Sequence, residues 1–243
     1  MTQTSDNHCP HNSEISCGNC RLKTLCLPIS IANDDIIKLE NIVSQGKPIH
    51  KGDALFRQDQ PFESIYAVRS GHIKSSRLSK SGIEQVTGFY FPGEIVGVDG
   101  IARGTHSSTA VALDTAAVCE IPFNKLEELS RDLPSLQRHF FQLMSREITD
   151  DQTLITLISK NSAEARIASL LLSISARQER RDLSGVTFSL PMSRADIGNF
   201  LGLTIETVSR TLTRLRKRDA LIIEGKELSL TNLHLLKEIA EVI

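Results

Sequence analysis

The sequence predicts an α+β chain in which an N-terminal β-roll is followed by a long helix and a C-terminal winged helix-turn-helix. Three observations predict this order: short Val-, Ile-, Phe- and Thr-rich runs between turn signals over residues 47–122, a helical stretch from about Pro134 to Lys160 with no Gly or Pro after its first residue, and two short helices around a glycine over residues 193–217. We divide the chain into a Cys-rich segment (1–30), a roll (31–132), a long helix (133–162) and a winged helix-turn-helix (163–243).

Composition limits the classes of protein that need to be considered. The chain has 243 residues and 40% hydrophobic content, enough for two modest domains. Its 28 basic and 29 acidic side chains give a net charge of -1, so any contact with nucleic acid must come from a local patch. The N-terminus has no cationic start followed by an apolar run, and no stretch is long enough to cross a bilayer. We therefore expect a cytoplasmic protein without membrane contact.

The cysteines indicate a metal site at the N-terminus. Four of the five lie in the first 26 residues, which would be an unusual disulfide framework in a chain without a secretion signal. Cys17, Cys20 and Cys26 form a thiolate trio, and Cys119 lies beyond the strands of the roll. These four sulfurs could hold zinc or an iron-sulfur cluster, or they could be buried structural cysteines, and spacing alone does not separate the three. Cys9 is a spare thiol without an assigned role.

The roll is predicted from its turn signals. They fall at residues 51–53, 69–71, 81–82 and 91–94, between runs that suit short antiparallel strands.

The long helix carries a heptad-like apolar spacing. From Pro134 to Lys160 it would span about 40 Å at 1.5 Å per residue. Steps of three and four give the seam of a two-stranded coiled coil, which we expect to form the dimer interface: Phe141, Met144, Ile148, Asp151, Ile155 and Ile158. The alternative is a helix packed only on its own roll through Leu143, Leu154 and Leu157. Paired carboxylates at Asp151 would repel each other, so the predicted dimer is marginal.

The C-terminal part contains two short helices joined by a tight turn. A helix over about 163–177 and a strand over 186–190 precede them. Ser193 with Asp196 gives a start signal, Gly202 a break and Thr204 a new cap. Small Gly198 allows a close crossing, and apolar residues form the interior: Ile197, Leu201, Leu203, Val208, Leu212 and Leu215. A hairpin over 221–230 completes a winged helix-turn-helix.

The second of these helices carries a face suited to reading DNA. Glu206, Ser209 and Arg210 share one side of its N-terminal half, the part that enters a major groove. Arginine can bridge guanine, a carboxylate can accept from cytosine, and serine can contact a base or phosphate. Thr207 is included with them as a DNA contact, and Arg214 with Arg216, Lys217 and Arg218 would supply charge for phosphates. The alternative is a structural helix pair with a solvated cationic face.

The sequence resembles the FNR/CRP family of bacterial transcription regulators, and within it the oxygen-sensing FNR/Anr branch, over nearly the whole chain. The resemblance rests on Cys17, Cys20, Cys26 and Cys119, on the segment IYAVRSGHIK (65–74), and on DIGNFLGLTIETVSR (196–210). It implies a roll like those that bind cyclic nucleotides, and one 4Fe-4S cluster per subunit on those four cysteines. Oxygen is then expected to degrade the cluster and loosen the dimer. Basic Arg21 and Lys23 should help to retain this anionic cluster.

The same resemblance implies a regulator of anaerobic metabolism genes. As a homodimer it would bind double-stranded DNA at inverted repeats with TTGAT-like half-sites, read by Glu206, Ser209 and Arg210, and would contact RNA polymerase to activate or repress. A zinc-stabilised regulator of the same fold remains an alternative.

Two other functions are weighed against this. A cyclic-nucleotide-responsive regulator would use Gly93-Glu94 with a nearby arginine, but residues 105–109 contain none, so no cyclic nucleotide is expected. An enzyme is not expected, because the chain has no nucleotide-binding glycine loop and no convincing Cys/His/Asp constellation.

Overall fold

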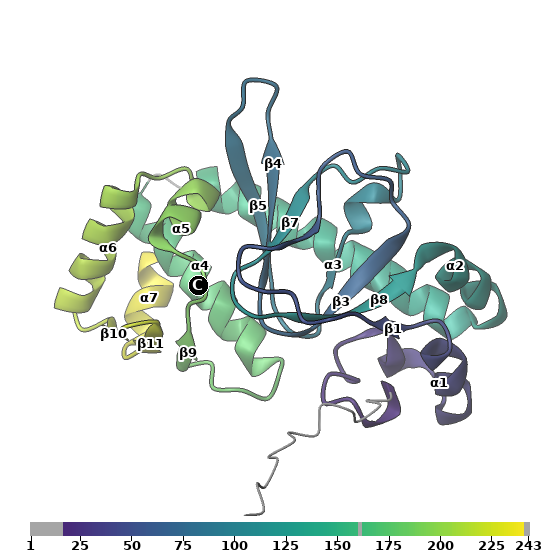
Figure 1. The fold of residues 1–243 in the computed structure, drawn as a ribbon. Helices are drawn as coiled ribbons and strands as arrows, with labels where there is room; N and C mark the ends of the chain where they lie inside the picture. Colours follow the sequence, from purple (N-terminus) through teal and green to yellow (C-terminus); the bar gives the residue numbers. More distant parts are fainter. Residues whose placement is uncertain (1–16, 160–161, 241–243) are drawn as a thin grey trace, which may run out of the picture.

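The computed structural model describes residues 17–159 and 162–240. It confirms the predicted fold class: an antiparallel roll, a long helix and a C-terminal helix-turn-helix follow one another along the chain. Figure 1 shows the roll in the middle, the long helix passing beside it, and the C-terminal part at the left of the view. No helix among the described residues is long and apolar enough to span a membrane.

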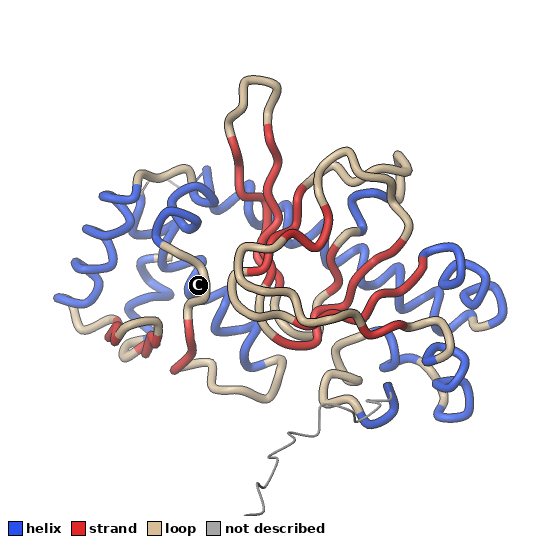
Figure 2. Tube along the Cα trace, viewed as in Figure 1, coloured by secondary structure: helices blue, strands red, loops and turns tan. Residues whose placement is uncertain are grey.

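The roll consists of two four-stranded antiparallel sheets. Their strand orders are β1-β8-β3-β6 and β2-β7-β4-β5. The β4–β5 hairpin extends beyond the rest of the roll, with a loop at its tip (Figure 2). The strands are β1 (Ser44–Gln45), β2 (Ala54–Phe56), β3 (Ser64–Ser70), β4 (Ile73–Leu78), β5 (Glu84–Tyr90), β6 (Ile95–Val96), β7 (Thr109–Ala112) and β8 (Ala117–Pro122).

One turn of the roll requires glycine. Gly71, between β3 and β4, has φ +70°, and a Cβ there would lie 2.5 Å from the carbonyl oxygen of Thr115. The roll's interior is apolar and includes Phe56, Val68 and Ile73.

The Cys-containing segment lies against the roll, packed with two helices that the sequence analysis did not predict. These are α1 (Asn33–Glu40) and α2 (Phe123–Asp132), and short 3-10 turns η1 (Cys17–Asn19) and η2 (Leu27–Ser30) precede them. A common apolar core joins this region to β3, β8 and the start of the long helix; its members include Leu27, Leu39, Ile65, Ile121, Leu126 and Leu136. The Cys segment therefore has its own packing against the roll.

The long helix α3 (Pro134–Ser159) confirms the predicted helix. Its inner side packs on the protein: Leu157 is buried, and Leu143 and Leu154 are partly buried against the two larger cores. Its outer side is apolar and exposed, with Phe141 62%, Ile148 56% and Ile155 70% exposed. Apolar side chains on both sides are expected of a helix with two partners.

The C-terminal part, residues 163–240, is called the head below. It consists of α4 (Ala163–Glu179), β9 (Thr187–Ser189), α5 (Arg194–Leu201), α6 (Ile205–Lys217), β10 (Leu221–Glu224), β11 (Glu227–Leu230) and α7 (Leu233–Ile239). The β10–β11 hairpin is the predicted wing, and β9 adds a third strand to it.

The predicted details of the helix-turn-helix are confirmed. Ser193 and Asp196 form a reciprocal capping box at the start of α5, and Thr204 caps α6. Gly202 has φ +65°, and a Cβ on Gly198 would lie 2.7 Å from the carbonyl oxygen of Leu203. Only glycine therefore allows this approach without a shift of the backbone.

The head is packed directly on its own roll. The rings of Phe89 in β5 and Phe200 in α5 have centroids 4.9 Å apart. The Asn199 amide donates to the carbonyl of Glu84 at 2.8 Å and accepts from the Val86 N–H at 2.6 Å. These contacts, together with the apolar core shared by both parts, place the head on the β5 side of the roll.

Candidate metal centre and nucleic-acid interface

All four predicted metal-ligating cysteines line one pocket. Cys17 lies in η1, Cys20 and Cys26 in the turns that follow, and Cys119 in β8. The local backbone brings the first three together, because Cys20 N–H bonds to the Cys17 carbonyl at 3.3 Å and Cys26 N–H to the Leu22 carbonyl at 3.0 Å. Within the roll, Cys119 pairs with Ala67 of β3 and Gln45 of β1. We call this space the cysteine pocket.

The surroundings of three of the pocket's cysteines disfavour their thiolate forms. Burial, followed by the charges of Cys119 and Glu40, raises the pKa of Cys17 to about 11. Burial also raises the pKa of Cys26 to about 12. For Cys119, burial raises the pKa while the Arg69 guanidinium opposes the shift. Thiolates in this pocket therefore need compensating positive charge, which a bound metal group provides.

The donor set consists of sulfur alone. The Glu40 carboxylate accepts from the Gly18 N–H at 3.1 Å, close to Cys17, but Glu40 does not line the pocket. In the ranges 17–159 and 162–240, no three His, Cys, Asp or Glu side chains are grouped to hold a metal ion. The four cysteines are therefore related by the pocket that they line together.

Two cations line the cysteine pocket, and one of them, Lys23, was predicted from the sequence. Lys23 lines it and donates to the Gly18 carbonyl at 3.4 Å. Arg21 is exposed and does not line it, so its expected influence is weaker than that of Lys23. Arg69 of β3 was missed: it lines the pocket and donates to Gln45 at 2.6 Å. Arg69 lies two residues after Ala67 on β3, so their side chains point to the same face of the sheet. Knowing that Cys119 pairs with Ala67 would therefore have placed Arg69 near the pocket. Cys9 lies outside the described residues.

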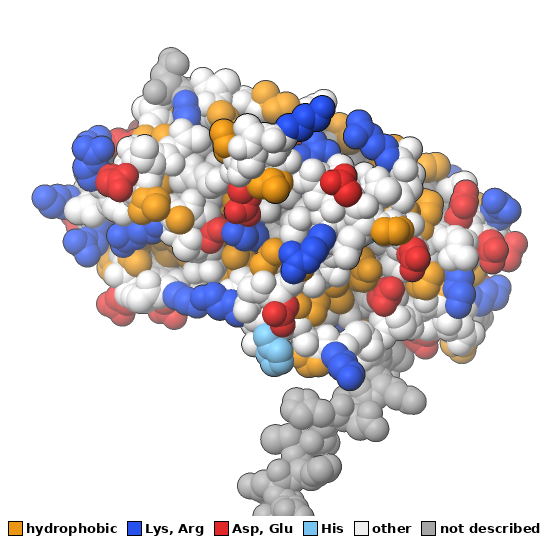
Figure 3. Space-filling model, turned by 45° about the horizontal axis from the view of Figure 1, so that its top comes forward, with side chains coloured by type: hydrophobic (Ala, Val, Ile, Leu, Met, Phe, Trp, Pro, Cys, Tyr) orange, Lys and Arg blue, Asp and Glu red, His pale blue; other side chains and the backbone are white. Residues whose placement is uncertain are grey.

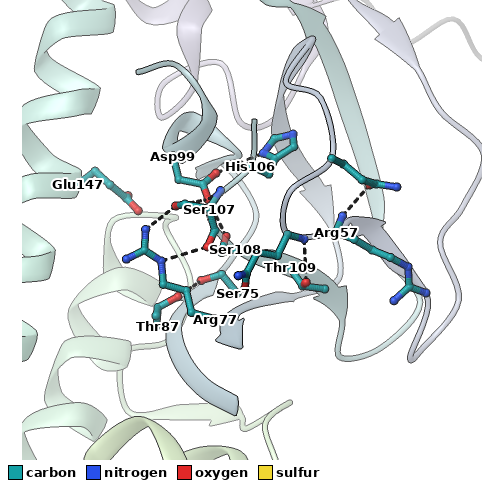
Figure 4. A network of polar contacts seen from close by, with 12 residues as sticks. Arg57, Ser75, Arg77, Thr87, Asp99, His106, Ser107, Ser108, Thr109 and Glu147 are labelled. Atoms are coloured by element: carbon teal, nitrogen blue, oxygen red, sulfur yellow. Dashed lines mark hydrogen bonds and ion pairs between the residues drawn. The ribbon is translucent and has the colours of Figure 1, made fainter. Parts of the chain in front are cut away.

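The segment that would hold a cyclic phosphate is occupied by an internal carboxylate. Asp99 accepts from the Ser107 N–H and hydroxyl at 2.9 Å each and from the Ser108 hydroxyl at 2.8 Å (Figure 4). His106 Nδ1 lies 3.3 Å from its other oxygen. Arg77 donates to the carbonyl and hydroxyl of Ser107 at 3.1 and 2.5 Å. The donors of this segment are therefore satisfied within the protein.

The six residues predicted for the dimer interface lie along the outer side of α3. Five of them, all except Phe141, also line a cavity of about 680 Å³ that the roll borders on its other side, so this face of α3 is exposed but overlooks the roll. Asp151 lies on this face, where burial and then the neighbouring Asp150 raise its pKa, with Arg77 opposing. The structure thus puts the six on one face, with the acid among apolar side chains.

The predicted DNA-contacting residues Glu206, Ser209 and Arg210 share the exposed side of α6, which we call the reading face. Glu206 and Arg210 are exposed, and Ser209 is partly exposed and accepts from Arg194 at 3.2 Å. Hydrogen bonds from its own backbone N–H and from Thr204 lower the pKa of Glu206, so it is an ionised acceptor. Thr207 is turned toward the cap, its N–H donating to the Thr204 hydroxyl at 3.2 Å.

Arg214, predicted as a DNA contact, is already ion-paired within the protein. Its guanidinium pairs with Glu164 of α4 at 2.7 Å, and Arg218 pairs with the other oxygen of Glu164 at 3.3 Å. Arg214 is nevertheless 65% exposed, and such surface pairs are weak enough to exchange partners. Figure 3 shows Lys and Arg side chains gathered at the left end of the molecule, where α6 lies in Figure 1.

Comparison with known proteins identifies families, relatives and a solved structure that this chain resembles. Residues 47–132 match the family model described as a cyclic nucleotide-binding domain, and residues 165–239 match a Crp-like helix-turn-helix domain. The transcriptional activator protein Anr of Pseudomonas protegens is 49% identical over 217 residues, which cover 89% of this chain and 88% of that protein. The fumarate and nitrate reduction regulatory protein of Escherichia coli is 43% identical over 226 residues, covering 93% and 90%. The structure of FixK2 from Bradyrhizobium japonicum superposes with a TM-score of 0.74 at 27% identity, covering 82% of this chain and 97% of that one.

Proposed function

The chain belongs to the FNR/CRP family of transcription regulators, in the branch of the Anr and fumarate and nitrate reduction proteins, and we propose that it is an oxygen-responsive regulator of anaerobic metabolism genes. In this proposal each subunit holds one 4Fe-4S cluster, which promotes homodimerisation and binding to inverted repeats in DNA. The family consists of DNA-binding regulators and not of enzymes.

The observation that carries the proposal is the common pocket of Cys17, Cys20, Cys26 and Cys119. A zinc ion needs its ligands at a single point, about 2.3 Å from each sulfur. A 4Fe-4S cluster takes one thiolate for each iron, which four cysteines lining one pocket can supply, and Lys23 and Arg69 suit its negative charge. The cluster would supply an inorganic centre that oxygen can attack. Holding it would tie the N-terminal segment to Cys119 of the roll.

DNA recognition is proposed to use the reading face. Arg210 can donate two hydrogen bonds to a guanine, and ionised Glu206 can accept from a cytosine N4. Ser209 would contact a base or phosphate, while Thr207 and Arg214 would contact the backbone, Arg214 by exchanging Glu164 for a phosphate. These contacts are assigned to TTGAT-like half-sites.

Dimerisation is proposed to use the outer face of α3. Its exposed apolar side chains would pack on the same face of a second copy, which matches the two-fold symmetry of an inverted repeat. RNA polymerase is the further proposed partner, for which the protruding β4–β5 hairpin offers an accessible loop.

A cyclic-nucleotide-responsive regulator is the rival with the same fold. Two features argue against it. Asp99 already accepts the hydrogen bonds of Ser107 and Ser108, and Glu94 is paired with Arg177 of α4 and with Arg181 just beyond it. A cyclic nucleotide would have to displace both internal pairings.

The proposed function is tested by anaerobic binding to an inverted-repeat duplex, before and after exposure to air, with iron and sulfide measured in parallel. Tight binding should be lost together with sulfide. Binding that is the same before and after sulfide loss would contradict the proposal. Calorimetric titration with cyclic AMP, for which no heat is expected, separates the rival.

A further inference from the structure

The turn between β5 and β6 is ion-paired to the head. The Glu94 carboxylate accepts from Arg177 Nε at 2.9 Å and from Arg181 Nη2 at 2.6 Å, and Arg177 also reaches its second oxygen. Both arginines belong to the C-terminal end of α4 or to the residues just beyond it. The side chains are largely removed from solvent, with Glu94 26% and Arg181 4% exposed.

The surroundings of Glu94 leave little freedom to these three side chains. Arg177 also donates to the Phe89 carbonyl at 2.6 Å, and Arg181 to the Pro92 carbonyl at 2.7 Å. The two guanidinium carbons lie 4.5 and 5.1 Å from the centroid of the Phe91 ring. Bidentate pairs with further hydrogen bonds and an aromatic face are the kind that fix geometry, in contrast to isolated surface pairs.

The opposite side of the same turn contacts the Cys-containing segment. Gly93 has φ +92°, and a Cβ there would lie 3.1 Å from Cβ and 3.3 Å from Cδ1 of Leu25. Leu25 lies in the loop between Cys20 and Cys26. The turn is therefore held between the loop that carries two of the pocket's cysteines and the helix α4.

From α4 the contacts continue to the helix-turn-helix. Glu164 pairs with Arg214 of α6 and with Arg218, which follows its last residue, and Arg166 donates to the carbonyl of Leu201 at 3.1 Å. The reading face remains exposed in this arrangement. The contacts at Glu94 thus hold the head on the roll in an orientation that leaves its DNA-reading side open.

We propose that Glu94 is a positioning residue that couples the cysteine pocket to the orientation of the head within one subunit, in addition to any effect through dimerisation. This rests on the proposed function. With Glu94 paired, the two reading helices of a dimer have a fixed separation. Without this pairing, each head turns more freely on its roll. Binding to two half-sites then costs the dimer more conformational entropy, and the dimer discriminates less between half-site spacings.

The test compares Glu94→Gln, which keeps the shape but removes the charge, with Glu128→Gln, which removes an exposed charge from α2. Both are purified without oxygen, iron and sulfide are measured, and sedimentation sets a concentration at which each is dimeric. Duplexes carry the inverted repeat with its natural spacing or with one or two added base pairs. Wild type and Glu128→Gln should prefer the natural spacing strongly. Glu94→Gln should bind it at least about 10-fold more weakly and show a flattened spacing preference.

A second variant tests the link to the cysteine pocket. Leu25→Ala leaves all four cysteines in place and should shift the spacing preference in the same direction as Glu94→Gln. Because both act through one turn, the double variant should be no weaker than Glu94→Gln alone. Additive losses, or a Glu94→Gln dimer with normal cluster content and wild-type spacing preference, would overturn the proposal.

The two proposals fail in different ways. If wild type binds equally well with and without sulfide, the proposed function is wrong, and the spacing preference of Glu94→Gln still reports on the positioning role. If wild type responds to sulfide loss but Glu94→Gln discriminates spacing normally, only the inference about Glu94 is wrong.

Discussion

The phenol of Tyr90 donates a 2.9 Å hydrogen bond to the carboxylate of Glu147, joining strand β5 of the roll to the long helix α3. The pair lies where the roll, α3 and the head come together, and both residues line two neighbouring cavities there. A titrating group at this position links pH to the packing of the helix on which the proposed dimer depends.

Glu147→Gln is predicted to stabilise the chain above neutral pH. Burial raises the pKa of Glu147 to about 7; the Tyr90 bond opposes this shift, and Asp151, Glu94 and Asp150 add to it. Since the folded-state pKa lies above the unfolded value, the stabilising contribution is complete below about pH 4.5 and is lost as the pH rises through about 7. At pH 8 the variant should be more stable by about 1–2 kcal/mol, and at pH 4.5 equal to wild type.

Urea denaturation of the monomeric, metal-free protein at the two pH values measures this difference. Tyr90→Phe is the matched control, because it removes the donor that lowers the pKa and should steepen the loss of stability with pH. Arg177 of α4 also lines a cavity with Glu147, so the titration should be compared at low and high salt. A wild-type stability that rises between pH 5 and 8 relative to Glu147→Gln would contradict the assignment.

Asp151→Ala is predicted to dimerise without a cluster. The substitution removes a carboxylate from the centre of the outer face, where burial and Asp150 already disfavour its charge. Asp150→Ala is the matched control, since it removes an exposed neighbouring charge that is not one of the six seam residues. Sedimentation velocity in the absence of iron should give dimers for Asp151→Ala and monomers for wild type. An obligate monomer for Asp151→Ala would count against the seam.

Arg210→Ala and Arg214→Ala are predicted to weaken DNA binding in different ways. Loss of Arg210 should cost about 1–3 kcal/mol on the preferred half-site and relax the preference at one base pair. Loss of Arg214, which is paired to Glu164, should weaken binding about equally for all sequences and lower the salt slope by at most about 1. Binding to a set of single-base operator variants at two salt concentrations measures both. If Arg210→Ala lowered the affinity for all operator variants equally, Arg210 would not be a base-reading residue.

Arg69→Gln is predicted to lose the cluster faster in air than Arg21→Gln does. Arg69 lines the cysteine pocket, whereas Arg21 is exposed outside it, so only the first removes a positive charge adjacent to an anionic group. The decay of visible absorbance after transfer to air measures the rate. Equal rates in the two variants would mean that the charge at the pocket wall has no special influence.

The helix-turn-helix could be predicted from the sequence because its signals are local. The Ser193 and Asp196 capping box and the Gly202 turn are read within a few residues of the structure that they specify. Helix α2 lacked such a signal, since Pro122 precedes it without a side-chain cap. Helix α7 does have a capping residue, Asn232, but it is only seven residues long and follows the wing directly.

The sequence identified which residue types would form the sites, but it could not supply every partner. The four cysteines were predicted together, whereas Arg69 depends on the register between β3 and β8. The pairing of Glu94 with Arg177 and Arg181 joins residues 83 and 87 positions apart, and no spacing rule connects a roll turn to a helix of another part of the chain. Such contacts follow only from the packing of the head on the roll.

Whether the four cysteines hold a cluster is decided by the iron and acid-labile sulfide per chain in anaerobically purified protein, measured for wild type and for Cys119→Ser. The account predicts about four irons and four sulfides per wild-type chain, and a large loss of both in the variant, because Cys119 brings the only one of the four sulfurs that comes from the roll. One zinc and no sulfide per wild-type chain, or full iron and sulfide in Cys119→Ser, would contradict it.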